Sequence, residues 1–375
     1  MNTASPQRSS LRELFTLFLR LGLTAFGGPA AHLALMQREA VDRRQWMNRS
    51  RFLDLVGACN LLPGPGSTQV AMALGYTRAG WPGLLVAGIC FILPASLATL
   101  ALAWAYLHFG SLPLIQGLLY GAKPVMLAIL AQAVWTLGRG ALRTPLFVAL
   151  GIAALAAALL GAPPLAVLLS AGILTLLLKF RTVSPHSAPA FTLLPATAGV
   201  TAAAGGLLTL FLVFLKLGVT VFGSGYVLLA FLQADLVERL HWITPAQLLD
   251  AVTAGQLTPG PVFATATFIG FLVHGWSGAT LATVAIFLPS FLMAAAVGAW
   301  TDRIRNSKLA GAFLDGVNAA AVALMGSVAL PLGRASLLDF CTWAITLISA
   351  LLLIRFRINA TWLILAAAIV GIFLH

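Results

Sequence analysis

The sequence predicts an all-α integral membrane protein built from two homologous repeats of inverted topology. Three observations favour this class: 60% hydrophobic against 9% charged residues, a segment that occurs twice, and an uneven charge on equivalent loops. A soluble domain of 375 residues would need far more charge to cover its surface. We expect each repeat to hold about five transmembrane helices plus one re-entrant or broken helical hairpin.

The duplication is visible as a long motif. Residues 18–27, FLRLGLTAFG, return as residues 214–223, FLKLGVTVFG, at an offset of 196 (214 minus 18). The same offset relates Asp54 to Asp250, and one deleted residue later reduces it to 195, as between Gly121 and Gly316. Transporters built from such repeats bind their substrate between the copies, near the bilayer midplane.

The repeat sets the predicted domain limits. We expect a first repeat over 1–178, a linker over 179–206 that is rich in Pro, Ser, Thr and Ala, and a second repeat over 207–375. Apolar segments are expected at 14–34, 52–76, 81–108, 113–137, 146–160 and 165–178, and in the second copy at 207–233, 247–273, 277–300, 310–332, 337–354 and 359–374.

Composition excludes several functions. The net charge of +12 comes from basic residues in short clusters between apolar runs, which is typical of cytoplasmic loops and not of a nucleic-acid binder. The chain has no phosphate-binding loop of the ATPase type, so a gradient or the membrane potential must drive any transport. The three cysteines and six histidines show no metal-ligand spacing, and we expect no metal, cofactor or enzymatic activity.

The loop charges favour inversion of the two copies. Residues 38–51 hold five arginines, whereas the equivalent loop holds Asp235, Glu238 and only Arg239. Inversion requires an odd number of crossings per copy, so one segment must fail to span. The second segment is the candidate, because Pro-Gly-Pro interrupts it in both copies at 63–65 and 259–261. A re-entrant hairpin would satisfy the break where protein covers it.

This topology places both termini outside. The outer face then keeps only Arg8, Arg12, Arg239 and Arg334, and the two N-terminal arginines are its weakest point. Fifteen basic residues fall inside: Arg38, Arg43, Arg44, Arg49, Arg51, Arg78, Arg139, Arg143, Lys179, Arg181, Arg303, Arg305, Lys308, Arg355 and Arg357.

Three basic residues lie within apolar segments. Arg20 and Lys216 are repeat equivalents, and Lys123 has Asn318 as its equivalent. A charge inside the bilayer costs at least about 2.5–3.5 kcal/mol, so such residues are functional candidates by default. Arg20 alone could instead extend to the interface from its place near the helix end. We predict that all three contact the substrate.

Glycine and proline breaks follow these cations. A helix that restarts after a break presents free N–H groups and the positive end of its dipole, which suits an anion. The alternative is a kink that serves only helix packing. The predicted binding residues at the breaks are Gly27, Gly28, Gly64, Gly66, Ser67, Thr68, Gly223, Ser224 and Gly260.

Two further pairs of equivalent residues flank the second break. Asp54 and Asp250 lie near the start of each broken segment, where a carboxylate either stabilises the helix dipole, couples protons to transport or pairs with Arg20 or Lys216. The amides of Asn60 and Gln256 just before the breaks either bind substrate oxygens or cap the interrupted backbone.

These motifs resemble the chromate ion transporter family in its two-domain form. The resemblance rests on residues 18–29 and 60–66, on their second-copy equivalents 214–225 and 256–261, and extends over essentially the whole chain. It implies export of chromate from the bacterial cytoplasm across the inner membrane, with resistance as the result and sulfate as an isosteric competitor. The second copy departs from the motif at Ser224, Gly225 and Val262, so the first copy is expected to be the better anion binder.

The charge of chromate agrees with a site of cations and helix N-termini. Expelling two negative charges from a cell that is negative inside is downhill by about 4.6 kcal/mol per 100 mV, so the potential, a proton gradient or both could drive export. A lipid-phosphate flippase is the alternative function, because it too uses inverted repeats and basic residues. Membrane lipid is an expected partner, and the sequence leaves a homodimer open.

Overall fold

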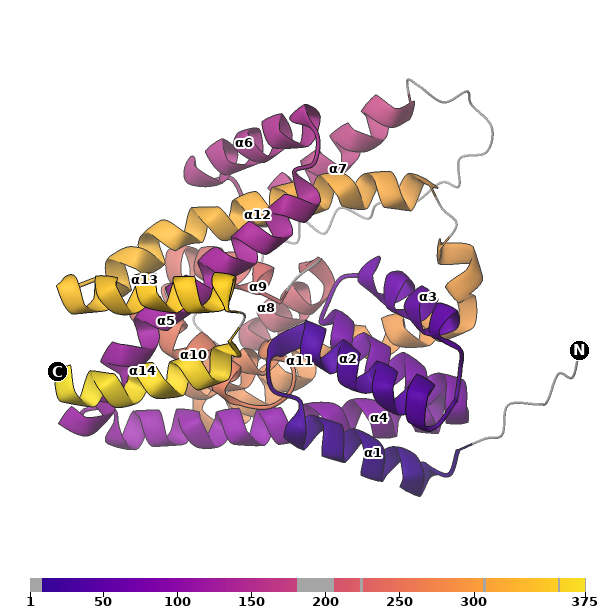
Figure 1. Ribbon diagram of the computed structural model, residues 1–375, viewed down its shortest axis with the longest axis horizontal. Helices are drawn as coiled ribbons and strands as arrows, with labels where there is room; N and C mark the ends of the chain where they lie inside the picture. The colour runs from indigo at the N-terminus through magenta and orange to yellow at the C-terminus, as the bar shows by residue number, and fades with distance from the viewer. Residues whose placement is uncertain (1–8, 181–205, 223–224, 306–307, 357, 375) are drawn as a thin grey trace, which may run out of the picture.

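The computed structural model describes residues 9–180, 206–222, 225–305, 308–356 and 358–374, and every regular element in these ranges is a helix (Figure 1). Four of the described helices are long and apolar enough to cross a membrane. They are α4 (Gly66–Phe109), α5 (Pro113–Ala141), α11 (Thr265–Arg305) and α12 (Lys308–Ser336). The lengths and composition agree with the predicted multi-pass membrane protein.

The first apolar segment of each copy is divided. In the first copy α1 (Leu11–Thr24) is followed by α2 (Gly28–Gln37) and a π-helical turn, η1 (Arg38–Arg43). The left-handed φ of Gly27, 102°, lets the chain reverse between α1 and α2 without strain. The second copy repeats this order as α8 (Leu207–Thr220), α9 (Val227–Leu232) and η2 (Gln233–Arg239).

The predicted interruption of the second segment is present in both copies. In the first copy α3 (Arg49–Asn60) ends before the Pro-Gly-Pro sequence and α4 begins after it. In the second, α10 (Pro245–Leu257) ends and a short turn, η3 (Val262–Ala264), leads into α11. The glycines within the breaks, Gly64 and Gly260, have φ values of 105° and 107°, which only glycine adopts readily.

A second reversal lies inside α4. Ala79 and Gly80 leave helical geometry, and a Cβ added at Gly75 would overlap the carbonyl oxygen of Gly83. Residues eight apart are about 12 Å apart in a straight helix, so the part before Gly80 must fold back along the part after it. The same close approach joins Gly270 and Gly278 across Gly275 in α11.

One end of the molecule carries a cluster of arginines. Arg44 Nε lies 3.3 Å from Glu13 Oε1, Arg78 Nε donates to Ser9 Oγ at 3.0 Å, and both guanidinium groups lie over the Trp46 ring. We call this the arginine-rich end and define it by Arg44, Trp46 and Arg78. Both hairpins of the first copy therefore start and finish at the arginine-rich end. One hairpin runs from α1 to η1, and the other runs from α3 to the turn of α4.

This geometry corrects the predicted topology at the N-terminus. The apolar stretch 14–34 was expected to span, which would place the start of α1 on the other side from residues 38–51. The Arg44–Glu13 contact instead puts both at the same end. The prediction was wrong because the break at Gly27 turns the segment back, whereas hydropathy records only its length. Arg8 lies outside the described residues.

The opposite end carries acidic residues. Tyr106, near the end of α4, donates to Asp250 Oδ2 at 3.1 Å, and Tyr120, near the start of α5, donates to Asp339 Oδ2 at 2.6 Å. We call this the acidic end and define it by Asp250 and Asp339. The part of α4 after its turn thus runs the full length of the molecule.

The last two helices form a hairpin that reaches the centre. α13 (Phe340–Arg355) starts at Asp339 and runs beside α5, where Gln132 Nε2 donates to the carbonyl of Leu353 at 3.1 Å. α14 (Ala360–Leu374) returns along α5, and Asn359 at the tip contacts Gly27. Arg355, predicted in an inside loop, therefore lies near the middle of the molecule, because each of these helices is too short to cross about 30 Å.

The equivalent hairpin of the first copy packs on α12. It consists of α6 (Pro145–Leu159) and α7 (Pro164–Phe180). Gly172 lies against the Phe313 ring, and Lys179 Nζ is 3.1 Å from Asp315 Oδ2. The terminal hairpin of the first copy thus packs on α12 of the second, and the terminal hairpin of the second packs on α5 of the first.

The breaks of the two copies meet at the centre. Gly64 N donates to Val221 O at 2.7 Å, and Gly260 N donates to Ala25 O at 3.0 Å. Gly64 and Gly260 are repeat equivalents, and so are Ala25 and Val221, so the exchange is reciprocal. Each break is therefore bonded to the other copy in the same way.

Apolar packing surrounds this centre on both sides. One buried cluster includes Phe214, Phe231 and Phe263, and a smaller one includes Phe18 and Phe91. The equivalent phenylalanines Phe18 and Phe214 are both fully buried, so the motif that reveals the duplication serves first to pack α1 and α8 against α4 and α11.

We predict that Gly121→Ala destabilises the protein, because the new Cβ would overlap the carbonyl oxygen of Ala367 in α14. Overpacking of this kind costs about 1–3 kcal/mol. Gly140→Ala is the matched control on the same helix, where an added Cβ meets nothing within 4 Å and helix propensity improves. Thermal unfolding in detergent should show a lower midpoint for the first variant only; equal midpoints would contradict the close packing of α5 and α14.

Candidate functional site

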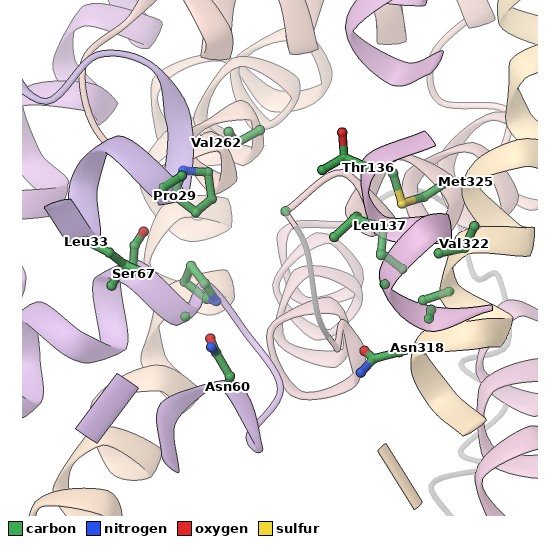
Figure 2. A pocket seen from close by; sticks show the side chains of 18 of the residues that line it. Pro29, Leu33, Asn60, Ser67, Thr136, Leu137, Val262, Asn318, Val322 and Met325 are labelled. Carbon is green, nitrogen blue, oxygen red and sulfur yellow. The ribbon is translucent and has the colours of Figure 1, made fainter. Parts of the chain in front are cut away.

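A large cavity lies between the breaks and the paired helices α5 and α12. Its volume is about 760 Å³. Pro29, Asn60 and Ser67 line it from one side, and Thr136 and Met325 from the other, as Figure 2 shows. The second copy contributes its own breaks through Gly225 and residues 261–263.

Helix N-termini form one wall of this cavity. The first bonds of α4 run from the N–H groups of Thr68 and Gln69 to Pro65 O, and no side chain caps the helix. The N–H groups of Gly66 and Ser67 precede these bonds and have no intrahelical partner. The start of α2 at Gly28 reaches the same wall through Pro29 and Ala30. The ends of two helix dipoles therefore make the wall electropositive without a charged side chain.

His32 joins the two breaks of the first copy. It is 1% exposed, its Nε2 lies 3.1 Å from Ala25 O, and its Nδ1 lies 3.0 Å from Ser67 Oγ. A carbonyl only accepts, so Nε2 must carry the proton and Nδ1 must accept from the Ser67 hydroxyl. His32 also lines the cavity. Sequence reasoning excluded only a metal role for it; the one signal available was that its repeat equivalent is Leu228.

Two amides face each other across the cavity. Asn60 ends α3, and its Oδ1 lies close to where a Cβ of Gly66 would be. Asn318 reaches in from α12 on the opposite wall (Figure 2). Asn60 was predicted from the sequence, whereas Asn318 was considered only as the uncharged equivalent of Lys123.

Charged residues gather at the cavity mouth. Arg143, between α5 and α6, lines the cavity and is exposed, and Asp315 lines it beside its partner Lys179. These residues lie at the ends of α5 and α7 and at the start of α12. The cavity therefore opens on the side of the molecule that carries the predicted inside cations Arg139, Arg143 and Lys179.

The structure does not bring Arg20 and Lys216 to this cavity. Arg20 Nη2 lies 3.7 Å from Glu39 Oε1, and Lys216 Nζ lies 2.8 Å from Asp235 Oδ2. Glu39 and Asp235 are repeat equivalents, so the duplication preserves an ion pair between the first helix of each copy and its π-helical turn. Their acidic partners were not considered because they lie in segments predicted as loops.

Lys123 lines a second cavity near the acidic end. This cavity of about 440 Å³ also includes Tyr106, Gln116, Asp250 and Ser336. Lys123 Nζ lies 3.2 Å from Asp250 Oδ1, and Asp250 is 3% exposed. Two residues that the sequence assigned to different roles are therefore partners.

The remaining predicted residues lie at or behind the breaks. Gly27, Gly64 and Gly260 form the turns, and Gly66 and Ser67 line the cavity. Thr68 and Gln256 are buried and do not line it, and Asp54 is half-buried in α3. Gly223 and Ser224 lie outside the described residues. Among the residues that are described, no group of three His, Cys, Asp or Glu side chains could hold a metal ion.

Broken helices that meet around an electropositive cavity, between two copies of one module, define a multi-pass membrane transport protein. The family model described as chromate transporter matches residues 12–176 and 208–372. The chain belongs to the chromate transporter family.

Relatives agree over nearly the full length. The chain is 32% identical to the chromate transport protein of Cupriavidus metallidurans over 97% of this chain and 93% of that protein. It is 33% identical to a probable chromate transport protein of Synechococcus elongatus over 91% and 89%, and 31% identical to the chromate transport protein of Pseudomonas aeruginosa over 98% and 93%. No solved structure matches the chain.

We predict that His32→Ala weakens anion binding at least about tenfold. The substitution leaves the Ser67 hydroxyl without its imidazole partner, at about 1–3 kcal/mol for a buried group, and leaves Ala25 O with the bond from Gly260 N alone. His32→Gln can keep one of the two bonds, so its dissociation constant should lie between those of the parent and of His32→Ala. Equilibrium dialysis of the purified proteins with sulfate or chromate measures the affinity; an unchanged dissociation constant for His32→Ala would remove it from the site.

We predict that Arg20→Gln and Lys216→Gln change the same affinity by less than about threefold. Both side chains lie outside the cavities, and their acidic partners keep other cations: Arg43 and Arg44 for Glu39, and Arg239 for Asp235. A tenfold loss of affinity in either variant would restore the sequence-based assignment.

Proposed function

We propose that this protein is a secondary transporter that exports chromate, and sulfate-like oxyanions, from the bacterial cytoplasm across the inner membrane. The observation that carries the proposal is the cavity of about 760 Å³ lined by helix N-termini, His32, Ser67 and two amides. Family membership supports an oxyanion as the substrate.

The donors in the cavity suit a tetrahedral dianion. Backbone N–H groups of Gly66 and Ser67 and the amide of Asn60 can each donate to a different oxygen. None of these groups carries a full charge, so the anion is not held by a buried ion pair and can leave again. Arg143 at the mouth raises the local anion concentration without entering the binding site.

The arginine distribution supports a cytoplasmic opening. Arg44 and Arg78 define the arginine-rich end, and Arg143 lies at the cavity mouth, whereas the acidic end carries Asp250 and Asp339. Loops rich in arginine stay in the cytoplasm. The proposed orientation therefore has the cavity open to the cytoplasm, which is the side from which an exported anion must enter.

We propose an inverted-repeat topology for the two copies. α4 runs from Arg78 at the arginine-rich end to Tyr106 near Asp250, and α11 starts beside the middle of α4, where Gly260 approaches Ala95. The reciprocal bonds of Gly64 and Gly260 support the same relation. Broken hairpins replace several of the predicted spans, so the count of five spans per copy is not part of this proposal.

Membrane potential is the proposed driving force. Two negative charges gain about 4.6 kcal/mol per 100 mV on leaving a cell that is negative inside. Asp54 and Asp250 remain the candidates for proton coupling, and Asp250 is the more buried of the two. No observation favours the lipid-phosphate flippase over transport of a free oxyanion.

The test uses inside-out vesicles and labelled chromate. We predict uptake when an interior-positive potential is imposed with potassium and valinomycin, because that potential drives export in the cell. Asn60→Leu should reduce the uptake rate at least about tenfold, while Gly57→Ala, on the same helix with nothing within 4 Å of its added Cβ, should not. A pH gradient applied at zero potential reports proton coupling. Absence of uptake under both gradients would refute the proposed function.

A further inference from the structure

Two equivalent helices pack differently in the two copies. Both α10 and its equivalent α3 pack against α4 and α11, but α10 also packs against α5, α12 and α14. The equivalent side chains Leu249 and Leu53 record the difference, because they are 1% and 53% exposed. α10 is therefore docked, and α3 stands beside the open cavity.

A specific contact accompanies the docking of α10. Lys123 Nζ of α5 lies 3.2 Å from Asp250 Oδ1, and Tyr106 donates to the other carboxylate oxygen at 3.1 Å. The same three residues line the second cavity.

The equivalents of these two residues lie on α3 and α12. Asp54 of α3 corresponds to Asp250, and Asn318 of α12 corresponds to Lys123 (318 minus 123 is 195). Asn318 lies across the cavity from the end of α3 in Figure 2. The equivalent of the Lys123–Asp250 contact would join Asn318 to Asp54.

The two cavities also have equivalent walls. Gly140, Ala141 and Arg143 line the first, and their equivalents Ala335, Ser336 and Leu338 line the second. Asp315 and Tyr120 are related in the same way. The cavities of about 760 and 440 Å³ therefore occupy equivalent places in the module, one large and one small.

We propose that the chain has a second form in which α3 closes on α12 through Asp54 and Asn318 while α10 leaves α5 and separates Asp250 from Lys123. This inference rests on the proposed function and names the residues that gate it. Exchange of the two conformations between the copies closes the first cavity and deepens the second, so an anion at the breaks changes sides without a continuous channel. An ion pair at one gate and an amide at the other favours the form open at the arginine-rich end.

The test exchanges the gate residues between the copies. In a background without the three native cysteines, single cysteines replace Leu53 or Leu249, and a membrane-impermeant maleimide is applied to vesicles of each orientation without substrate. With all gate residues unchanged, the maleimide should react rapidly with Leu53→Cys and slowly with Leu249→Cys. Lys123→Asn with Asn318→Lys should raise the labelling rate of Leu249→Cys, and lower that of Leu53→Cys, at least about fivefold. Asn318→Gln is the uncharged control and should change neither.

A cross-link provides the second measurement. Asp54→Cys with Asn318→Cys should form a disulfide under mild oxidation, although the open cavity now separates the two helices, because a disulfide requires Cα atoms within about 7 Å. Unchanged labelling after the exchange, or failure of this pair to cross-link, would overturn the second form. Chromate uptake in vesicles is measured separately. Uptake without the expected labelling and cross-linking would refute the proposed gate and leave the proposed function standing. The expected labelling and cross-linking without any uptake would refute the proposed substrate.

Discussion

The fold depends on the hydrogen bonds that the two copies exchange at their breaks. A helix interrupted inside a membrane protein exposes backbone groups that lipid cannot satisfy, at several kcal/mol each. Here Gly64 N finds Val221 O and Gly260 N finds Ala25 O, so each break is satisfied by the other copy. The first N–H groups of α4 take no part in this exchange, and they face the cavity.

Charge and binding are separated in space. The intramembrane cations Arg20, Lys216 and Lys123 all lie beside a carboxylate, and none of the three lines the first cavity. Backbone, hydroxyl, imidazole and amide groups line the wall of that cavity at the breaks, away from Arg143 and Asp315. Partners lower the cost of a charge in an apolar environment, but they also remove its attraction for an anion. Dipoles of helix ends attract the anion without such partners, which is why glycine and proline, and not lysine, mark the site.

Pattern reasoning located the breaks and the paired aspartates, because Pro-Gly-Pro and a long repeat have direct consequences for the backbone. It could not tell a spanning segment from one that turns back, since hydropathy measures length and not direction; residues 14–34 and Arg355 were misplaced for that reason. Partners across the fold were also hidden. Glu39 lay in a segment expected to be a loop, and His32 stood alone in an apolar run, so neither had a signal beyond its position in the repeat.

The reciprocal bonds make each half of the chain an incomplete folding unit. A lone copy inserted in a bilayer would carry an amide and a carbonyl whose hydrogen-bond partners belong to the other copy. Because one polypeptide contains both copies, each break is always made together with the residues that complete its hydrogen bonds. With the pairing secured in this way, the side chains of one copy can differ from those of the other while the bends of the backbone are kept. Leu228, at the position equivalent to His32, is an example.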